Sequence, residues 1–359
     1  MIKLKKRLVF ILFIALLILI SGCKGKKSNE KSLEEIRTGT EGITMNFLAN
    51  APPTTIHVEK GAGENANSFE VVLEMRNKGA FPQPNEGTAP DGKIYLSGYD
   101  PNIINFRDTN IQDTNRKALE GKSTINPNGG LDIATFKGVI QVDNLNVDKY
   151  EPTLLATACY FYQTVAGPSV CIDPNPYSTT NEKKVCQVQD ISLSSQGAPV
   201  AITKIDEEAF ATKTQFKITI KNAGNGEVIK YDMLNKCGPS GEKILREEVD
   251  RVHLQEVRIG NKELTCGPFT DTGGSAARGR GGDVRLINGE GFVICELPSS
   301  DYGSKTAYIT PMTISLVYIY RNSIEKKIQI KQEVSGLGGS SGVSTPSTSS
   351  PSSEWYGPQ

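Results

Sequence analysis

The sequence predicts an all-β protein built from two tandem β-sandwich domains with long loops. Segments in which apolar and polar residues alternate are common, whereas long apolar stretches with helical periodicity are scarce. The 359-residue chain contains 35 glycines and 19 prolines, which favour frequent turns. Several segments of the first half also recur, in the same order, in the second half, and this indicates that one domain is repeated.

The N-terminal segment is typical of an export signal. Basic residues from Lys3 to Arg7 precede an unbroken apolar run over residues 8–20, which is shorter than the roughly 20 residues that a membrane-spanning helix needs. The run ends at Ser21-Gly22-Cys23 and resembles the lipobox of prokaryotic lipoproteins. That resemblance implies cleavage after Gly22 and a lipid on the Cys23 thiol. An ordinary signal peptide with an incidental cysteine, or a short uncleaved anchor, are the alternatives.

Two polar segments flank the expected domains. Residues 23–42 are rich in charged residues and predict a flexible tether, while the Gly, Ser, Thr and Pro of residues 334–359 predict a disordered tail. The tail carries Trp355, the only tryptophan, next to Tyr356. This pair is either a short recognition patch for a partner or a chance pair of exposed aromatic residues.

The charge of the mature chain argues against nucleic acid as a partner. Cleavage after residue 22 removes four of the 40 Lys and Arg residues and leaves 36 of them against 40 Asp and Glu residues. A nucleic-acid-binding protein needs a basic face, which a net negative chain does not favour.

The repeat assigns residues 43–187 to the first sandwich and residues 188–333 to the second. Alternation places Phe69, Val71, Leu73 and Met75 on one strand face in the first copy, and Phe216, Ile218 and Ile220 on one strand face in the second. Three pairs of segments match in order, namely "MRNKG" with "IKNAG", "GVIQV" (138–142) with "GFVIC" (291–295), and "YFY" (160–162) with "YIY" (318–320).

The strands that end in Asn-x-Gly, in "MRNKG" and "IKNAG", resemble the CARDB-type immunoglobulin-like modules of prokaryotic surface proteins, archaeal ones especially. The resemblance covers residues 42–332 in outline. It implies two immunoglobulin-like sandwiches that act as binding or spacer modules rather than as an enzyme, and it carries over no ligand residues.

Six cysteines remain after Cys23, and an even number in an exported chain predicts disulfides, although free buried thiols are the alternative. The segment from Cys159 to Cys171 is interpreted as a hairpin that places these two residues opposite each other. Cys266 and Cys295 end two alternating segments of the second copy. The remaining pair is then Cys186 with Cys237, which antiparallel pairing of the neighbouring strands would bring together.

The sequence shows no pattern for a catalytic group, a metal or a cofactor. His57 and His253 lie in alternating segments without the spacing of metal ligands, and they are interpreted as strand residues. The Asx-rich segment 108–115 lacks the spacing of a calcium-binding EF-hand, so turns are the favoured interpretation. The glycine-rich segment 273–283 carries Arg278 and Arg280, which either contact an acidic partner or polysaccharide or lie in a flexible surface loop.

These observations predict a non-enzymatic lipoprotein on the extracytoplasmic side of the cell membrane. Anchored by a lipid on Cys23, it would bind an envelope protein or glycan, or act as a spacer. The alternatives are an envelope hydrolase or sugar-binding component with a site built from loops, and a structural subunit that assembles through the edges of its sheets.

Overall fold

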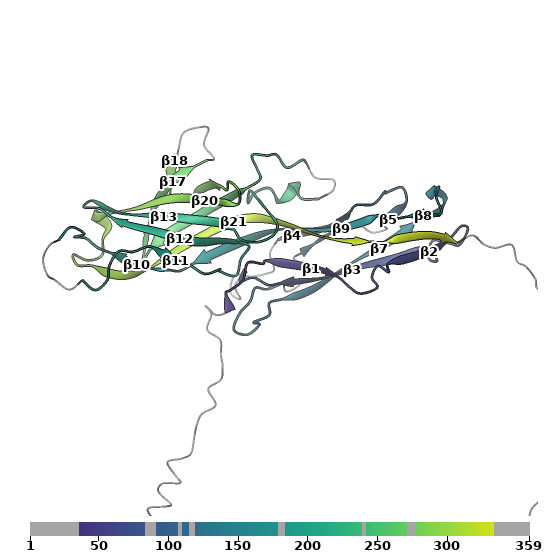
Figure 1. Ribbon diagram of the computed structural model, residues 1–359, viewed down its shortest axis with the longest axis horizontal. Helices are drawn as coiled ribbons and strands as arrows, with labels where there is room; N and C mark the ends of the chain where they lie inside the picture. Colours follow the sequence, from purple (N-terminus) through teal and green to yellow (C-terminus); the bar gives the residue numbers. More distant parts are fainter. Residues whose placement is uncertain are drawn as a thin grey trace, which may run out of the picture.

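The computed structural model describes residues 36–82, 91–106, 110–114, 119–178, 184–238, 242–270 and 277–333. It confirms the predicted all-β class. The described part of the chain forms an elongated body of two β-sandwich lobes placed end to end (Figure 1). The 3-10 turns that lie entirely within these ranges are η2 (Val142–Asn144), η3 (Leu234–Lys236) and η4 (Ser299–Asp301).

Lobe 1 has one sheet of four strands, in the order β1 (Ile43–Phe47), β3 (Ser68–Asn77), β7 (Leu131–Ile140) and β5 (Ile104–Phe106). Its second sheet contains β4 (Gly92–Ser97), β6 (Ile111–Asp113) and the halves of β9 (Thr153–Ala166) and β21 (Tyr308–Lys327) that lie in this lobe. A small sheet of β2 (Thr55–Glu59), β22 (Gln329–Glu333) and β8 (Lys149–Tyr150) closes its outer end.

Lobe 2 has a sheet in the order β11 (Ile191–Ser192), β12 (Val200–Ala209), β13 (Lys213–Asn222), β20 (Glu290–Pro298), β17 (Thr265–Phe269) and β18 (Ala277–Gly279). Opposite this sheet lie the other halves of β9 and β21, together with β10 (Ser169–Ile172), β14 (Glu227–Ile229), β15 (Arg251–Ile259), β16 (Lys262–Glu263) and β19 (Gly282–Arg285).

Strands β9 and β21 pass through both lobes. They pair antiparallel without a break, from Ile314 opposite Ala166 to Lys327 opposite Thr153. Each sequence copy therefore contributes strands to both lobes, and β22 of the second copy pairs with β2 of the first. The bounds 43–187 and 188–333 stay a proposal for where one repeat ends and the next begins along the chain.

The apolar faces expected from alternation are buried, as predicted. Side chains of one face of β3 and one face of β13 fill the cores of lobes 1 and 2: Phe69, Val71, Leu73, Met75, Phe216, Ile218 and Ile220. The neighbouring residues on each strand, such as Lys217, point away from the core. Period-two burial explains why these segments fold as strands.

One of the three sequence matches is wrong by six residues. The backbone N–H of Asn77 donates to Gly130 O at 3.0 Å, and that of Asn222 donates to Gly289 O at 2.8 Å. Gly130 is thus the counterpart of Gly289, and "GVIQV" does not correspond to "GFVIC". A shift by an even number of residues keeps every side chain on its expected face, so alternation alone cannot detect the error.

Within the described ranges, three disulfides join in pairs the six cysteines that follow Cys23. They are Cys159–Cys237, Cys171–Cys186 and Cys266–Cys295, so only the last of the expected pairs is confirmed. The expected hairpin from Cys159 to Cys171 is wrong, because β10 does not fold back on β9. Instead, β10 follows β9 and pairs with the same edge of β21 in the same register. Cys159 therefore lies opposite Arg321 and Cys171 opposite Ile309, so the two cysteines are far apart along β21.

Glu207 is a buried carboxyl in lobe 2. Its side chain is only 7% exposed, and Oε2 accepts the backbone N–H of Cys171 at 3.3 Å. Its other oxygen, Oε1, has no hydrogen-bond partner within the described ranges. Burial raises the pKa of this carboxyl to about 7, and the Cys171 N–H offsets this only in part.

Replacing Glu207 with Gln is expected to stabilise the protein at pH 8 and to have little effect at pH 4. The pKa of Glu207 is 4.5 in the unfolded chain and about 7 in the folded protein. Between these values the folded protein binds a proton that the unfolded chain has lost, so stability falls as the pH rises through that window. Above it, the substitution should gain on the order of 1–2 kcal/mol. Thermal unfolding at both pH values measures this, with Glu208→Gln on the exposed side of β12 as the control. An equal shift at pH 4 and pH 8 contradicts it.

Candidate functional site

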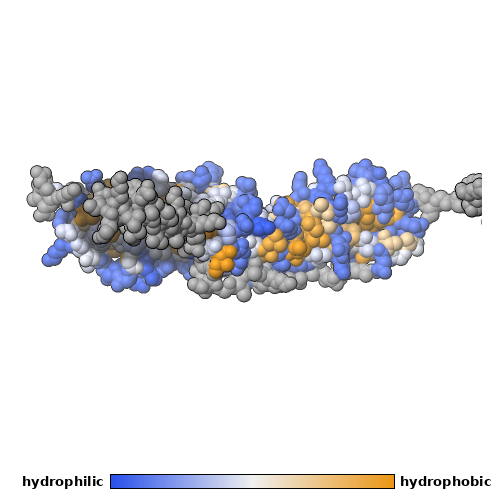
Figure 2. Space-filling view, turned by 90° about the horizontal axis from the view of Figure 1, so that it is seen from below, coloured by the Kyte–Doolittle hydropathy of each residue, from blue (hydrophilic) through white to orange (hydrophobic). Residues whose placement is uncertain are grey.

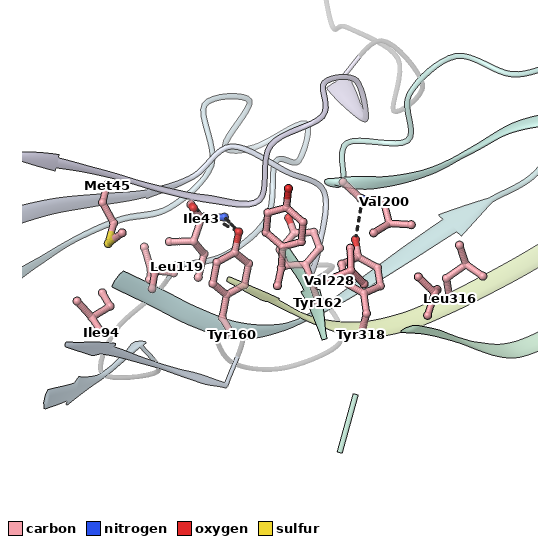
Figure 3. Close-up of a cluster of buried hydrophobic side chains, with 14 of the residues drawn as sticks. Ile43, Met45, Ile94, Leu119, Tyr160, Tyr162, Val200, Val228, Leu316 and Tyr318 are labelled. Carbon is pink, nitrogen blue, oxygen red and sulfur yellow. Dashed lines mark hydrogen bonds between the residues drawn. The ribbon is translucent and has the colours of Figure 1, made fainter. Parts of the chain in front are cut away.

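Four tyrosines mark the junction between the lobes. Tyr160 and Tyr162 on β9 pack against Tyr320 and Tyr318 on β21, with ring centroids 6.1 and 6.4 Å apart. Figure 3 shows Tyr160, Tyr162 and Tyr318 of this group. Burial raises the pKa of all four phenols, so they remain neutral. The quartet joins the cores of the two lobes into one continuous cluster.

Two of these tyrosines bind the Asn of an Asn-x-Gly motif. Tyr162 donates its hydroxyl to Asn77 Oδ1 at 3.0 Å, and Tyr320 donates to Asn222 Oδ1 at 3.3 Å. Each Asn amide also donates to the carbonyl four residues later, Asn77 to Phe81 at 2.7 Å and Asn222 to Gly226 at 2.9 Å. The same set of hydrogen bonds therefore holds the end of β3 in lobe 1 and the end of β13 in lobe 2.

The glycines of these motifs make room for the tyrosine hydroxyls. A Cβ on Gly79 would lie 2.0 Å from the Tyr162 hydroxyl, and one on Gly224 would lie 2.3 Å from the Tyr320 hydroxyl. No side chain fits at such distances. The Asn-x-Gly motif thus has a structural reason in this protein, since Asn holds the hydroxyl and Gly admits it.

The other two tyrosines bind β1 and β12, the strands that lie beside β3 and β13 in their sheets. Tyr160 accepts the backbone N–H of Ile43 at 3.0 Å, and Tyr318 accepts that of Val200 at 3.3 Å (Figure 3). The carbonyls of the same two residues accept hydrogen bonds from Asn322 Nδ2 at 2.9 Å and from Thr164 Oγ1 at 2.6 Å. Lobe 1 and lobe 2 therefore repeat the same contacts with β9 and β21 exchanged.

The opposite face of β9 and β21 is covered by the segment after β14. Cys159 and Ile319 form a small apolar cluster with Ile229 and Cys237, and Leu234 packs against it. The Cys159–Cys237 disulfide fixes this cover to β9. The junction is thus packed on both faces, which makes it unsuited to act as a hinge.

A cleft of about 290 Å³ opens beside the tyrosines. Backbone and side chains of residues 40–46 form one wall, and residues 322–324 of β21 form the other. Lys78 at its rim pairs with Glu41 at 3.3 Å. Asn322 is one of the residues that line the cleft, and its Oδ1 is buried without a hydrogen-bond partner in the described structure. The cleft is therefore the candidate binding site.

The arginines that the sequence singled out lie away from this cleft. Arg278, on β18 in lobe 2, pairs with Glu296 at 3.1 Å, and Arg280 pairs with Glu263 at 3.2 Å. Both side chains are exposed and both pair with a carboxylate of their own lobe, which Arg278 shares with Lys213. A role in binding an acidic partner or polysaccharide stays a prediction.

The two histidines occupy strands, as interpreted from the sequence. His57 on β2 lies 2.5 Å from Glu333 on β22, and His253 on β15 lies 2.7 Å from the buried Asp283. The ring of Tyr231 packs on His253 at 4.5 Å. Within the described ranges, no group of three or more His, Cys, Asp or Glu side chains is placed to hold a metal ion.

Three of the predicted site residues, Cys23, Trp355 and Tyr356, lie outside the described residues. So do the expected signal peptide and the tail 334–359. The end of the expected tether is described, and there Ile36 is buried and Gly39 N donates to Ser195 Oγ at 2.9 Å. No helix in the described chain has the length and apolar character needed to cross a bilayer.

Sequence reasoning did not find the junction. It identified Asn-x-Gly and Tyr-x-Tyr as repeated segments, but Asn77 lies 85 residues from Tyr162, and Asn222 lies 98 residues from Tyr320. The available signal was that both motifs occur in each copy, Tyr-x-Tyr once in each, and Asn-x-Gly at the end of one alternating segment in each, although Asn-x-Gly also occurs at 85–87 and 128–130. Two motifs that are repeated together can be expected to touch each other.

The outer face of lobe 1 carries exposed apolar residues. Leu131 and Ile133 on β7 are 43% and 55% exposed, and the view from below shows apolar surface over this lobe (Figure 2). The counterpart of Ile133 in lobe 2 is Phe292, which is 48% exposed and has the Lys217 ammonium 5.1 Å from its ring centre.

Comparisons with known proteins add weak likenesses only. No protein-family model and no curated protein matches the chain, so the resemblance to CARDB-type modules stays a prediction. The C-terminal domain of the Streptococcus pyogenes antigen I/II-family protein AspA is 11% identical, covers 82% of this chain and 100% of its own, and gives a TM-score of 0.17. The CupB6 tip adhesin from Pseudomonas aeruginosa is 7% identical, with 83% and 98% covered and a TM-score of 0.18. The collagen-binding domain of the Erysipelothrix rhusiopathiae surface protein RspB is 10% identical, with 81% and 97% covered and a TM-score of 0.12. At these TM-scores the likeness carries no conclusion about function.

Proposed function

We propose that this protein is a lipid-anchored, extracytoplasmic binding module that does not act as an enzyme. The export signal and the lipobox-like Cys23 support the location, and so do the three disulfides, because such bonds persist mainly outside the cytoplasm. The partner is an envelope protein or glycan. The lipid on Cys23 holds the module at the membrane.

The observation that carries the binding role over a spacer role is the point where the tether joins the body. The described chain begins at Ile36, at the junction between the lobes, and not at either end of the long axis (Figure 1). A spacer is best anchored at one end. A body held at its middle keeps both lobes and the junction cleft close to the envelope, within the reach of a 13-residue tether, roughly 45 Å when extended.

Replacing Cys23 with Ser is expected to abolish lipid attachment and release the protein from the membrane fraction. Cys23 is the only thiol at the end of the apolar run, and a serine hydroxyl does not replace it as the lipid acceptor. Metabolic labelling with a fatty-acid probe, followed by fractionation, measures both effects. Ser28→Ala in the tether is the control. Equal labelling of the wild type and Cys23→Ser rules out the anchor.

A further inference from the structure

The outer edge of β1 has unused backbone groups. Leu48 N donates to Val72 O, and Lys78 N donates to Gly42 O, so the even-numbered residues of β1 bond to β3. In an antiparallel pair the groups between them point the other way. Tyr160 and Asn322 satisfy those of Ile43, but the N–H and C=O groups of Met45 and Phe47 face outward. No described strand pairs with this edge.

The repeated lobe shows that a strand fits at this position. In lobe 2 the counterpart of β1 is β12, since Ile43 and Val200 make the same contacts with the tyrosines. Strand β12 carries β11 on its outer edge, with Ile191 opposite Ile205 and Ser192 opposite Lys204. By the registers with β3 and β13, Ile205 and Lys204 correspond to Phe47 and Asn46. The place that β11 fills in lobe 2 therefore has no described occupant in lobe 1.

The chain before β1 does not turn back along β1, whereas the chain before β12 turns back along β12 as β11. Residues 39–42 instead lead from the junction, where Gly39 N donates to Ser195 Oγ of lobe 2.

The second wall of the cleft is also an open edge. Ile328 N donates to Pro152 O, in the register that β21 keeps with β9, so the even-numbered residues of this part of β21 bond to β9. The backbone groups of the odd-numbered residues Ser323 and Glu325 therefore point away from β9.

The side chains along this opening indicate what would occupy it. Phe47 and Ile324 are only partly buried at the rim of the core, which favours an apolar residue over them. Asn322 Oδ1 is buried beside the opening and has no hydrogen-bond partner among the described residues. The Lys326 ammonium lies 5.8 Å from the Phe47 ring centre and has no carboxylate partner in the described chain, while burial lowers its pKa. An acidic residue would complement it.

We propose that the β1 edge binds an extended segment of a partner protein, which adds as a strand beside Met45 and Phe47 and carries an apolar and an acidic residue. Backbone hydrogen bonds to the edge would give affinity, and the two side chains would give selectivity. The inference rests on the proposed binding role and names the partner class for the junction cleft.

The test uses the full chain in detergent micelles and a synthetic peptide with the sequence of residues 187–193, QVQDISL. This segment contains β11, together with an acidic and an apolar residue. The peptide should bind and slow hydrogen exchange at the amides of Met45 and Phe47 by at least about tenfold, while amides on the outer edge of lobe 2 stay unchanged. Lys326→Gln should weaken binding by about tenfold, and the exposed Lys327→Gln should not.

Several results would overturn the proposal. They are no binding at about 1 mM peptide, binding without protection of Met45 and Phe47, and equal affinity for Lys326→Gln and the wild type. Amides of Met45 and Phe47 that are protected before peptide is added would mean that the chain itself fills the edge, and protection that grows with protein concentration would mean that a second copy does. Because no step depends on Cys23, loss of the lipid anchor and failure of strand addition are separate outcomes.

Discussion

A fragment spanning residues 188–333 is expected to remain unfolded in isolation. Lobe 2 needs the part of the chain from Tyr162 to Ile172, because this part pairs with β21 and buries side chains such as Val170 in the core. Each fully buried Val or Ile contributes about 1.5–3 kcal/mol, and the whole stability of a protein is about 5–15 kcal/mol. Losing β9 and β10 should therefore remove the folded state. Far-ultraviolet circular dichroism and urea titration measure it.

The matched control separates the lost strands from the lost disulfide. The chain 36–333 with both Cys159→Ser and Cys237→Ser keeps every strand and should still unfold cooperatively, and the fragment should carry Cys237→Ser as well. Mixing fragments 36–187 and 188–333 should restore strand structure, since β9 and β21 can then pair. A cooperative urea transition in the isolated fragment 188–333 would show that lobe 2 folds without β9.

Replacing Gly224 with Ala is expected to destabilise the protein by about 2–3 kcal/mol. The new methyl group would lie 2.3 Å from the Tyr320 hydroxyl, while its other neighbours are no closer than 3.0 Å. Tyr320→Phe alone should cost about 1–2 kcal/mol, because it removes hydrogen bonds to Gly226 and Asn222. The double variant should cost less than the sum, since the ring without its hydroxyl leaves space for the methyl group.

Urea unfolding of the four proteins gives the coupling energy of this cycle. Gly63→Ala is the control, because a Cβ there meets nothing within 4 Å. Gly79→Ala should be more harmful and should not be rescued by Tyr162→Phe, since the carbonyls of Gly197 and Glu41 also lie within 2.7 Å of the new Cβ. Strict additivity for Gly224 and Tyr320 would mean that the hydroxyl does not set the need for glycine.

Local strand structure could be predicted from the sequence because burial has period two. The buried faces of β3 and β13 follow directly from alternation, and so does the all-β class. Alternation holds no information about a partner strand. This is why the hairpin between Cys159 and Cys171 was wrong, since nothing local shows that the chain continues along β21 after Pro168.

The junction could not be predicted for the same physical reason. Its contacts join residues that are far apart in sequence, such as Ile43 and Asn322, and they depend on both copies contributing to each lobe. A single sequence shows which segments are alike but not which of them exchange partners. The open edge of β1 follows from the strand order, which a single sequence does not show, and the counterpart β12 with β11 beside it indicates what can fit there.

The central claim is that β9 and β21 make the two lobes one cooperative unit. Native-state hydrogen exchange of the full chain with Leu73→Ala tests it most directly. Leu73 is fully buried in lobe 1, so its truncation should cost about 2–5 kcal/mol. The account predicts that amides of β13 in lobe 2 lose as much protection as amides of β3. Loss of protection in β3 with unchanged exchange at Phe216 to Ile220 would contradict it, because the lobes would then unfold independently.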